Sequence, residues 1–167
     1  MASAYSFDVT STVDLQEVDN AINQARKELG QRFDFKGSSA KIDLDQKNNT
    51  ITLSAEDAFK LEAVWDVLQT RLVRRDVPVR NLKRGDIDAA GGGTVKQTIT
   101  LQQGISSDVA REIVKFLKDA KLKKVQAAIQ ADQLRISSPS KDELQTAMQH
   151  LRAHDFGIAL EFGNYRS

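Results

Sequence analysis

The sequence has no cysteine, only two prolines and few aromatic residues, which make up 6% of its 167 residues. Without cysteine, the chain can form neither disulfides nor thiolate metal sites. No apolar run approaches the roughly 20 residues that a membrane-spanning helix needs. The first residues, MASAYSFDVTSTVD, lack the basic start and apolar stretch of a secretory signal. We therefore expect a cytoplasmic protein that does not engage a membrane.

A large excess of charge of one sign is also missing. The 24 Lys and Arg residues and 23 Asp and Glu residues leave a formal net charge of +1. No global field therefore draws nucleic acid to the molecule. Two segments are nevertheless locally basic, because residues 71–84 and residues 115–124 each contain several cations and a single acid.

The apolar residues that are present follow one order of elements twice. In the first half, alternation and helical spacing predict a strand at 5–10, a helix at 15–29, strands at 40–45 and 50–54, a helix with its apolar stripe at 61–72 and a short edge strand at 77–82 that contains Pro78. In the second half, they predict a strand at 94–101, a helix with its stripe at 109–120, strands at 124–130 and 134–137, a helix after the cap at Ser140 and a strand at 157–162. Each half therefore reads βαββαβ, the ferredoxin-like plan, with two helices on one face of an antiparallel sheet.

The other face of each predicted sheet is polar and lacks aromatic rings. RNA-binding modules of this fold stack bases on aromatic side chains of their central strands. Here the outward positions are small and polar: Ser6, Asp8, Thr50, Thr52, Thr98 and Thr100. Any nucleotide would therefore bind through phosphate contacts, base edges and loops. The glycine-rich segment RGDIDAAGGG (84–93) is predicted to link the two halves.

The segment QRFDFKG (31–37) joins the first helix to the second strand. If side chains alternate along this segment as they do in a strand, Phe33 and Phe35 lie on one side and pack between the helix and the sheet. The charged residues Arg32, Asp34 and Lys36 then face water. The functional interpretation is that Arg32 and Lys36 bind phosphate, while Asp34 accepts a hydrogen bond from a guanine edge or orients Arg32. The two interpretations are compatible, because buried rings would hold the charges rigidly.

Two further segments could contact phosphate. Gly104, Ser106 and Ser107 stand at a predicted helix start, where free backbone N–H groups can hold an anion, although the pattern alone favours ordinary capping by Ser106 or Ser107. In the following helix, Lys115, Lys118 and Lys121 are spaced as a row that could follow a phosphate backbone; the alternative is that they offset the helix dipole.

Other patterns favour structural roles. Arg71 and Arg75 fall within a predicted helix and suit ordinary helix-end positions. His150 and His154 have a spacing that can bind zinc, but no Glu lies between them, and we interpret them as exposed. No nucleophile–base pair or carboxylate dyad stands out. We therefore expect no enzyme activity, no cofactor and no metal.

Four stretches together resemble the YajQ family of bacterial proteins over nearly the whole chain: RFDFKG, SFDVTSTVDLQEVDNAI, LQQGISSDVAREIVKFLKDAKLKKVQAAIQ and LEFGNYRS. The resemblance implies two tandem ferredoxin-like domains of ribonucleoprotein type whose N-terminal strands are exchanged. Strand 5–9 would join the second sheet and strand 95–101 the first. The implied domains are 11–90 plus 95–101, and 1–10 plus 102–167.

The resemblance also implies nucleotide or nucleic-acid binding, and for some members the reception of cyclic di-GMP with action through protein partners. When the motifs of the family are matched to this sequence, the resemblance adds Gln103, Gly104 and the lysine-rich helix end to the expected binding residues. The expected nucleotide-binding residues are Arg32, Asp34, Lys36, Gln103, Gly104, Lys115, Lys118, Lys121 and Lys123. Lys123–Lys124 and the segment 80–93 depart from the family pattern.

The function expected from the sequence is thus binding of a phosphate-bearing nucleotide, with cyclic di-GMP as one candidate and a protein partner downstream. Two alternatives remain open. The first is an RNA- or tRNA-binding protein, whose affinity would fall steeply with salt. The second is a protein-interaction adaptor that works without any ligand.

Overall fold

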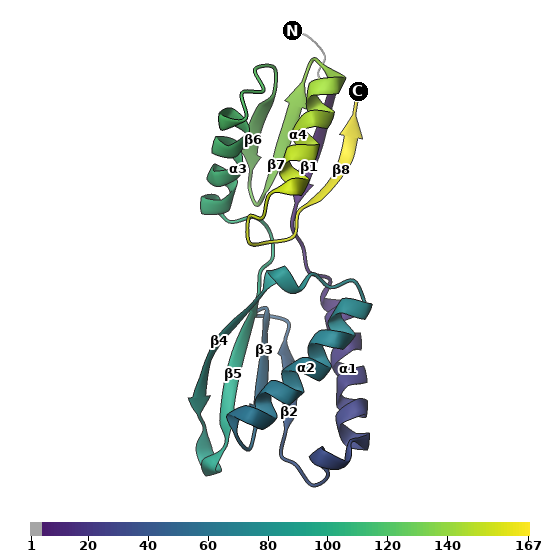
Figure 1. The fold of residues 1–167 in the computed structure, drawn as a ribbon, viewed down its shortest axis with the longest axis vertical. Helices are drawn as coiled ribbons and strands as arrows, with labels where there is room; N and C mark the ends of the chain where they lie inside the picture. Colours follow the sequence, from purple (N-terminus) through teal and green to yellow (C-terminus); the bar gives the residue numbers. More distant parts are fainter. Residues whose placement is uncertain (1–4) are drawn as a thin grey trace. The chain divides into compact units, whose positions relative to one another are not determined.

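The computed structural model describes residues 5–167, which fall into two compact units. The continuous unit is Val13–Gln102. The split unit combines Met1–Thr12 with Gln103–Ser167. Each contains two α-helices and one four-stranded antiparallel sheet within the part of the chain that the structure describes (Figure 1). The predicted α+β class, with helices and antiparallel sheets, is confirmed.

The continuous unit has its helices on one face of its sheet (Figure 1). The strand order is β2-β3-β5-β4. Its elements in chain order are α1 (Leu15–Gln31), the 3₁₀ helix η1 (Phe33–Phe35), β2 (Lys41–Asp45), β3 (Thr50–Ala55), α2 (Ala58–Arg74), the 3₁₀ helix η2 (Val79–Asn81), β4 (Leu82–Ala89), the 3₁₀ turn η3 (Gly91–Gly93) and β5 (Val95–Leu101).

The split unit has the strand order β6-β7-β1-β8. Its elements are β1 (Tyr5–Thr10), α3 (Ser107–Asp119), β6 (Gln126–Gln130), β7 (Gln133–Ser138), α4 (Lys141–Ala153) and β8 (Glu161–Arg166). Strand β1 thus pairs with β7 and β8, while β5 pairs with β3 and β4. Strand β1 is therefore far in the sequence from both of its neighbours, whereas β5 is far from β3 but follows β4 directly.

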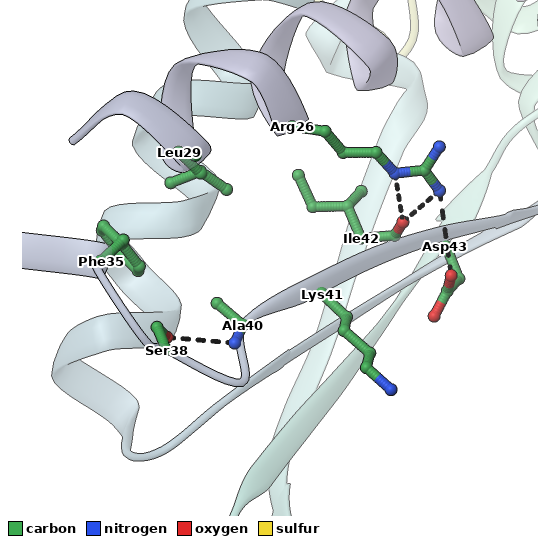
Figure 2. Close-up of a pocket in the computed structure, with 9 residues that line it drawn as sticks. Arg26, Leu29, Phe35, Ser38, Ala40, Lys41, Ile42 and Asp43 are labelled. Carbon is green, nitrogen blue, oxygen red and sulfur yellow. Dashed lines mark hydrogen bonds and ion pairs between the residues drawn. The ribbon is translucent and has the colours of Figure 1, made fainter.

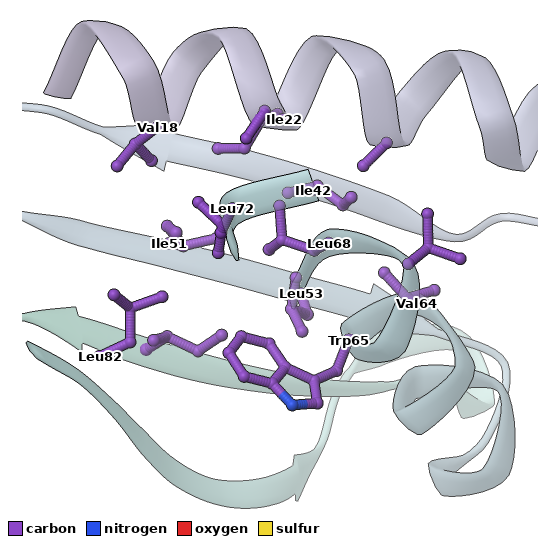
Figure 3. Close-up of a cluster of buried hydrophobic side chains, with 14 of the residues drawn as sticks. Val18, Ile22, Ile42, Ile51, Leu53, Val64, Trp65, Leu68, Leu72 and Leu82 are labelled. Carbon is purple, nitrogen blue, oxygen red and sulfur yellow. The ribbon is translucent and has the colours of Figure 1, made fainter. Parts of the chain in front are cut away.

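Apolar stripes on the helices meet the inward residues of each sheet. Figure 3 shows Ile22 of α1, Leu68 of α2 and Ile51 of β3 within one cluster of buried side chains, and all three are fully buried. In the split unit, Phe7 of β1 and Ile113 of α3 belong to the corresponding core. Burying one such side chain contributes about 1.5–3 kcal/mol, so these two cores account for much of the stability.

Polar side chains cap the starts of α1 and α4. The Asp14 carboxylate accepts hydrogen bonds from the backbone N–H groups of Gln16 and Glu17 and caps α1. The Ser140 hydroxyl accepts one from the N–H of Glu143 and caps α4. Helix α1 continues one residue beyond Gly30, which therefore lies inside the helix rather than at its end. No helix in residues 5–167 is both long enough and apolar enough to cross a membrane.

The glycine-rich segment 84–93 is a hairpin and does not link the two units, which corrects the sequence interpretation. Its first part belongs to β4, which pairs with β5 up to Ala89 opposite Val95. The turn is made by η3, where Gly92 and Gly93 have φ values of +71° and +76°. Glycine adopts such angles without steric cost, so a glycine run suits a hairpin as well as it suits a linker. Pro78 lies before the strand, in contrast to the predicted strand 77–82.

Two other strand predictions differ from the structure. Alternation in the predicted strand 124–130 places Val125, Ala127 and Ile129 inward, but Ile129 is 47% exposed because β6 lies at the edge of its sheet. The final strand begins at Glu161 and not at Gly157. Ser6 and Asp8 do lie on the alternate face of β1 from Phe7, but both are buried, because arginines from β7 and β8 cover them.

Candidate functional site

The RFDFKG motif forms a turn in which its two phenylalanines diverge. Residues 33–35 are a 3₁₀ helix, with about three residues per turn, so residues two apart point to different sides. Phe35 is buried, at 6% exposure, whereas Phe33 is 90% exposed. The prediction that both rings are buried is therefore wrong for Phe33. Alternation failed here because it assumes extended backbone.

Arg32 and Asp34 form a two-point ion pair on the surface of this turn. Arg32 Nε donates to Asp34 Oδ1 at 3.0 Å, and Nη2 donates to Oδ2 at 2.8 Å. This hydrogen bonding lowers the pKa of the Asp34 carboxyl below its usual value. The guanidinium carbon of Arg32 lies 5.3 Å from the centroid of the Phe35 ring. Asp34 therefore orients Arg32, as one of the two sequence interpretations supposed, and Lys36 is exposed beside them.

The turn is also tied to the first turn of α2. The Lys60 ammonium lies 4.7 Å from the centroid of the Phe35 ring and donates a hydrogen bond to the backbone oxygen of Asp34. A cation over an aromatic face is attracted by the ring quadrupole, by about 0.5–1 kcal/mol at exposed sites. Arg32 and Lys60 thus both contact Phe35, and they fix the position of its ring.

A pocket of about 280 Å³ opens between the end of α1, the loop after η1 and strand β2 (Figure 2). Leu29, Phe35, Ala40 and Ile42 supply its apolar lining. Its polar lining comes from Arg26, Ser38, Lys41 and Asp43. Gly30 also lines it, and a Cβ added there would meet no atom within 4 Å. We call this the α1–β2 pocket.

Hydrogen bonds hold the walls of the α1–β2 pocket. Arg26 donates from Nε and Nη2 to the backbone oxygen of Ile42, at 3.2 and 2.6 Å, and lies 3.8 Å from Asp43 Oδ1 (Figure 2). The Ser38 hydroxyl accepts from the N–H of Ala40 at 3.0 Å and donates to Glu56 at 2.8 Å. That bond from Ser38 lowers the pKa of Glu56. The pocket is therefore preformed.

A lysine, Lys41, lies at the rim of this pocket. Figure 2 shows the Lys41 side chain extending away from the pocket, on the opposite side of β2 from Ile42. Lys41 is exposed, so its ammonium is accessible to an anion in solution. Sequence reasoning missed Arg26 and Lys41. The sequence pattern showed that Arg26 lies on the polar side of its helix and Lys41 on the outward side of its strand. It did not show that the two residues line one pocket, because that depends on how α1 packs on β2.

The remaining predicted site residues belong to the split unit, whereas Arg32, Asp34 and Lys36 belong to the continuous unit. Gly104 has φ of +79°, and its N–H donates to the backbone oxygen of Ser11 at 2.7 Å. An added Cβ would lie 2.6 Å from Asp132 Oδ2. Glycine is thus required by the turn itself, and Gln103 precedes it. Ser106 caps α3 through the N–H of Val109 at 3.3 Å, which is ordinary capping.

The predicted lysine row is interrupted. Helix α3 ends at Asp119, and Lys121 has a left-handed φ of +59°, so it does not continue the line of Lys115 and Lys118. All three are exposed, as is Lys123 beyond the helix. Helical spacing predicted the row correctly only as far as the helix extends.

The arginines and histidines with helical spacing have structural contacts. Arg71 in the last turn of α2 and Arg75, the C-cap residue of α2, form ion pairs with Glu28 and Glu17 of α1, at 2.6 and 3.3 Å. Both arginines therefore lie at a helix end, as predicted, and they also tie α2 to α1. The His154 ring packs 4.6 Å from the Phe116 ring, centroid to centroid. Within residues 5–167, no group of three or more histidine or acidic side chains is placed to hold a metal ion.

Comparison with known proteins assigns the family. A family model described as "Nucleotide-binding protein YajQ-like" matches residues 5–166. A protein named "Nucleotide-binding protein" from Solibacter usitatus is 51% identical over 162 residues, which cover 97% of each chain. A protein of the same name from Carboxydothermus hydrogenoformans is 49% identical over 166 residues, which cover 99% of this chain and 100% of the relative. The chain therefore belongs to the YajQ family.

Proposed function

We propose that this chain is a nucleotide-binding protein and that its ligand binds in the α1–β2 pocket. The observation that carries the proposal is a preformed pocket with apolar walls and a cationic rim, built in part by the RFDFKG motif. Small-molecule sites are typically concave and mostly apolar, with a few polar groups that fix orientation. The names of the relatives, which describe nucleotide binding, agree with this chemistry.

In this proposal the base enters the pocket and the phosphate stays at the rim. Leu29, Phe35 and Ile42 offer the apolar contacts that a planar base needs. The Asp43 carboxylate and the Ser38 hydroxyl are hydrogen-bonding groups for base edges. Lys41 also lines the pocket, and its long side chain, which extends away from the pocket in the structure, would turn toward the phosphate on binding.

The size of the pocket bears on the ligand. Pockets for drug-sized ligands measure about 300–1,000 Å³, so this one, at about 280 Å³, suits one base with part of its ribose. Cyclic di-GMP would place one guanine inside and leave its second half exposed to solvent or to a protein partner. In that case the exposed half, together with Phe33 and Lys36, is the natural contact for the partner.

Calorimetry of the full chain with GMP, GTP, cyclic di-GMP and tRNA tests the proposal. Gly30→Leu places a side chain in the pocket, whereas Gly30→Ala is the matched control that keeps it open. We expect Gly30→Leu to weaken binding about tenfold or more, since the base loses its apolar contacts. Lys41→Gln should weaken ligand binding less than Gly30→Leu does. Lys47→Gln, in the turn between β2 and β3, should leave ligand binding unchanged. Silence from all four ligands, or equal affinity of both Gly30 variants, would reject the proposal.

We also infer that the strand pairing is an exchange between two βαββαβ repeats, with domains 11–90 plus 95–101 and 1–10 plus 102–167. The pairing of β1 with β7 and β8 supports it, as does that of β5 with β3 and β4. If so, residues 13–102 contain a complete sheet and core, and that fragment should fold alone. A fragment without cooperative thermal unfolding would contradict the inference.

A further inference from the structure

Each sheet of this protein ends at two edge strands. In the split unit the edges are β6 and β8, and in the continuous unit they are β2 and β4. An edge strand has a row of N–H and C=O groups that can pair with a strand of another chain, so natural proteins usually block their edges with charges, bulges or covering groups. The four edges of this protein differ in how far they are protected.

Three of the four edges are protected. Strand β2 has the sequence KIDLD, with a charged residue at every second position, and Arg26 donates two hydrogen bonds to the backbone oxygen of Ile42. Strand β4 carries several charges, and its register against β5 shifts between Arg84 and Ile87. Strand β8 has a register shift against β1 and a left-handed φ of +55° at Asn164. A regular ladder with a further strand is therefore disfavoured at β2, β4 and β8.

Strand β6 (Gln126–Gln130) lacks these protective features. Its sequence, QAAIQ, has no charge and no proline, and all of its residues pair with β7 in unbroken register. Ile129 lies on the side of the sheet that faces the helices, opposite the buried Leu134 of β7, yet it is 47% exposed. Ala128, on the other face, is exposed as well. Solvent therefore reaches both faces of β6, and its edge is open to another strand.

The hairpin of β6 and β7 determines which backbone groups face the open edge. Only two residues join the strands, and Gln130 pairs with Gln133 across that turn. Residues that flank a two-residue turn exchange hydrogen bonds, and bonded and non-bonded pairs then alternate along the antiparallel ladder. Gln130 and Ala128 therefore bond to β7, whereas the N–H and C=O groups of Ala127 and Ile129 point outward.

Strand β6 is complementary to a second copy of itself. If two copies pair antiparallel about Ala128, Ala127 lies opposite Ile129 of the second copy, so the outward backbone groups of both strands meet. A small side chain then faces the large exposed one. The same register brings Lys124, four residues before Ala128, to the level of Asp132, four residues after it, in the second copy. Both side chains are exposed, so opposite charges meet at each end of the pairing.

We propose that β6 is an interface and that its occupant is β6 of a second copy of this chain. The dimer is isologous, with a twofold axis at Ala128, and it joins the sheets of the two split units into one. Backbone pairing provides the affinity, and the contacts between Lys124 and Asp132 fix the register. Interfaces below about 1,200 Å² are typically transient, so a contact limited to one strand gives a dimer whose population rises with protein concentration. The proposal involves no residue of the α1–β2 pocket and is independent of nucleotide binding.

Cysteine cross-linking of the full chain tests the register, because the chain has no cysteine of its own. Ala128 lies opposite itself in a non-hydrogen-bonded pair, where Cα atoms are about 4.5 Å apart, which is close enough for a disulfide. We expect Ala128→Cys to form a linked dimer with oxidised glutathione. Gln126→Cys is the matched control on the same face of β6. It would lie opposite Gln130, roughly 13 Å from its counterpart, and should stay monomeric.

Sedimentation velocity at increasing protein concentration measures the dimer without a cross-link. We expect the average mass of the unmodified chain to rise with concentration. Ile129→Lys places a charge at the open edge and should weaken association about tenfold or more. Phe33→Lys introduces the same charge at an exposed apolar residue of the continuous unit and should leave association unchanged. If Ile129→Lys fails to fold, the comparison of Ala128→Cys with Gln126→Cys decides the question.

Charge reversal tests the contacts at the ends of the pairing. Lys124→Glu should weaken association about threefold or more, because the new carboxylate would face Asp132 of the second copy. Lys47→Glu makes the same change of charge in the exposed turn between β2 and β3 and should have no effect. A chain that stays monomeric at every concentration, equal cross-linking of the two cysteine variants, or equal association of Lys124→Glu and Lys47→Glu would overturn the proposal.

Discussion

At the scale of single residues, Asp8 is the most informative charge in the split unit. Burial by itself raises the pKa of its carboxyl, but hydrogen bonds from Asn164, Arg135 and Arg166 outweigh burial and hold the pKa below its usual value. The shortest of these runs from Asn164 Nδ2 to Asp8 Oδ2 at 2.6 Å. The ionised carboxylate is therefore favoured by folding, and stability is linked to its protonation.

We predict that Asp8→Asn lowers the free energy of unfolding by about 2 kcal/mol at neutral pH, since charged hydrogen bonds are lost. Because the folded pKa lies below the unfolded value of about 3.9, the stabilisation is complete above that value and is lost as pH falls through the folded pKa. Urea unfolding of both proteins should therefore converge in acid. Asp108→Asn, in an exposed ion pair, should change stability by less than about 0.5 kcal/mol. A pH-independent difference for Asp8→Asn would contradict this account.

Two glycines make an internal comparison. Gly104→Ala should lower the free energy of unfolding by more than about 1 kcal/mol, because φ is positive and the new Cβ would collide with Asp132. Gly30→Ala should raise it by about 0.5–1 kcal/mol, since Gly30 lies inside α1 with open space around it. Thermal or urea unfolding measures both. Equal effects of the two substitutions would show that these backbone conformations are wrongly assigned.

At the scale of elements, helical stripes and caps were predictable because they are local. Asp14 and Ser140 cap the helices expected from their neighbours. The turn η1 was not predictable, because two phenylalanines two residues apart fit a strand as well as a 3₁₀ turn. The position of Lys121 was not predictable either, because it depends on where α3 ends. The helix ends at Asp119 and Lys121 has a left-handed backbone conformation, which hydrophobic periodicity does not reveal.

The divergence of the two rings in η1 can be tested directly. Phe35→Ala should lower the free energy of unfolding by about 3–5 kcal/mol, as expected for a buried aromatic side chain. Phe33→Ser should change it by less than about 0.5 kcal/mol, because Phe33 is 90% exposed. Chemical denaturation measures both values. A large loss in Phe33→Ser would show that the exposed ring packs on the protein.

At the scale of the whole molecule, the number of helices and sheets followed from the repeated order of elements, but the pairing of strands did not. Periodicity shows that β1 and β5 have an inward face; it does not show which sheet each joins. Only the family resemblance indicated the pairing. The hairpin of β4 and β5 was missed for a related reason, because its glycines look like a linker until the partner strand is known.

The candidate site, like the strand pairing, could be predicted only in part from the sequence. The motif residues Arg32, Asp34 and Phe35 stand out in the sequence, and two of them meet in one ion pair. The α1–β2 pocket also needs Arg26 and Lys41, which come from two elements that only tertiary packing brings together. Sequence reasoning therefore located one wall of the pocket and not the pocket itself.

The most direct test of nucleotide binding in the α1–β2 pocket is an NMR titration of the isotope-labelled full chain with GMP. The account predicts saturable shifts of the backbone amides of Leu29, Gly30 and residues 38–43, and their loss in the Gly30→Leu variant. Amides that do not move at saturating ligand, or shifts that persist unchanged in Gly30→Leu, would contradict it.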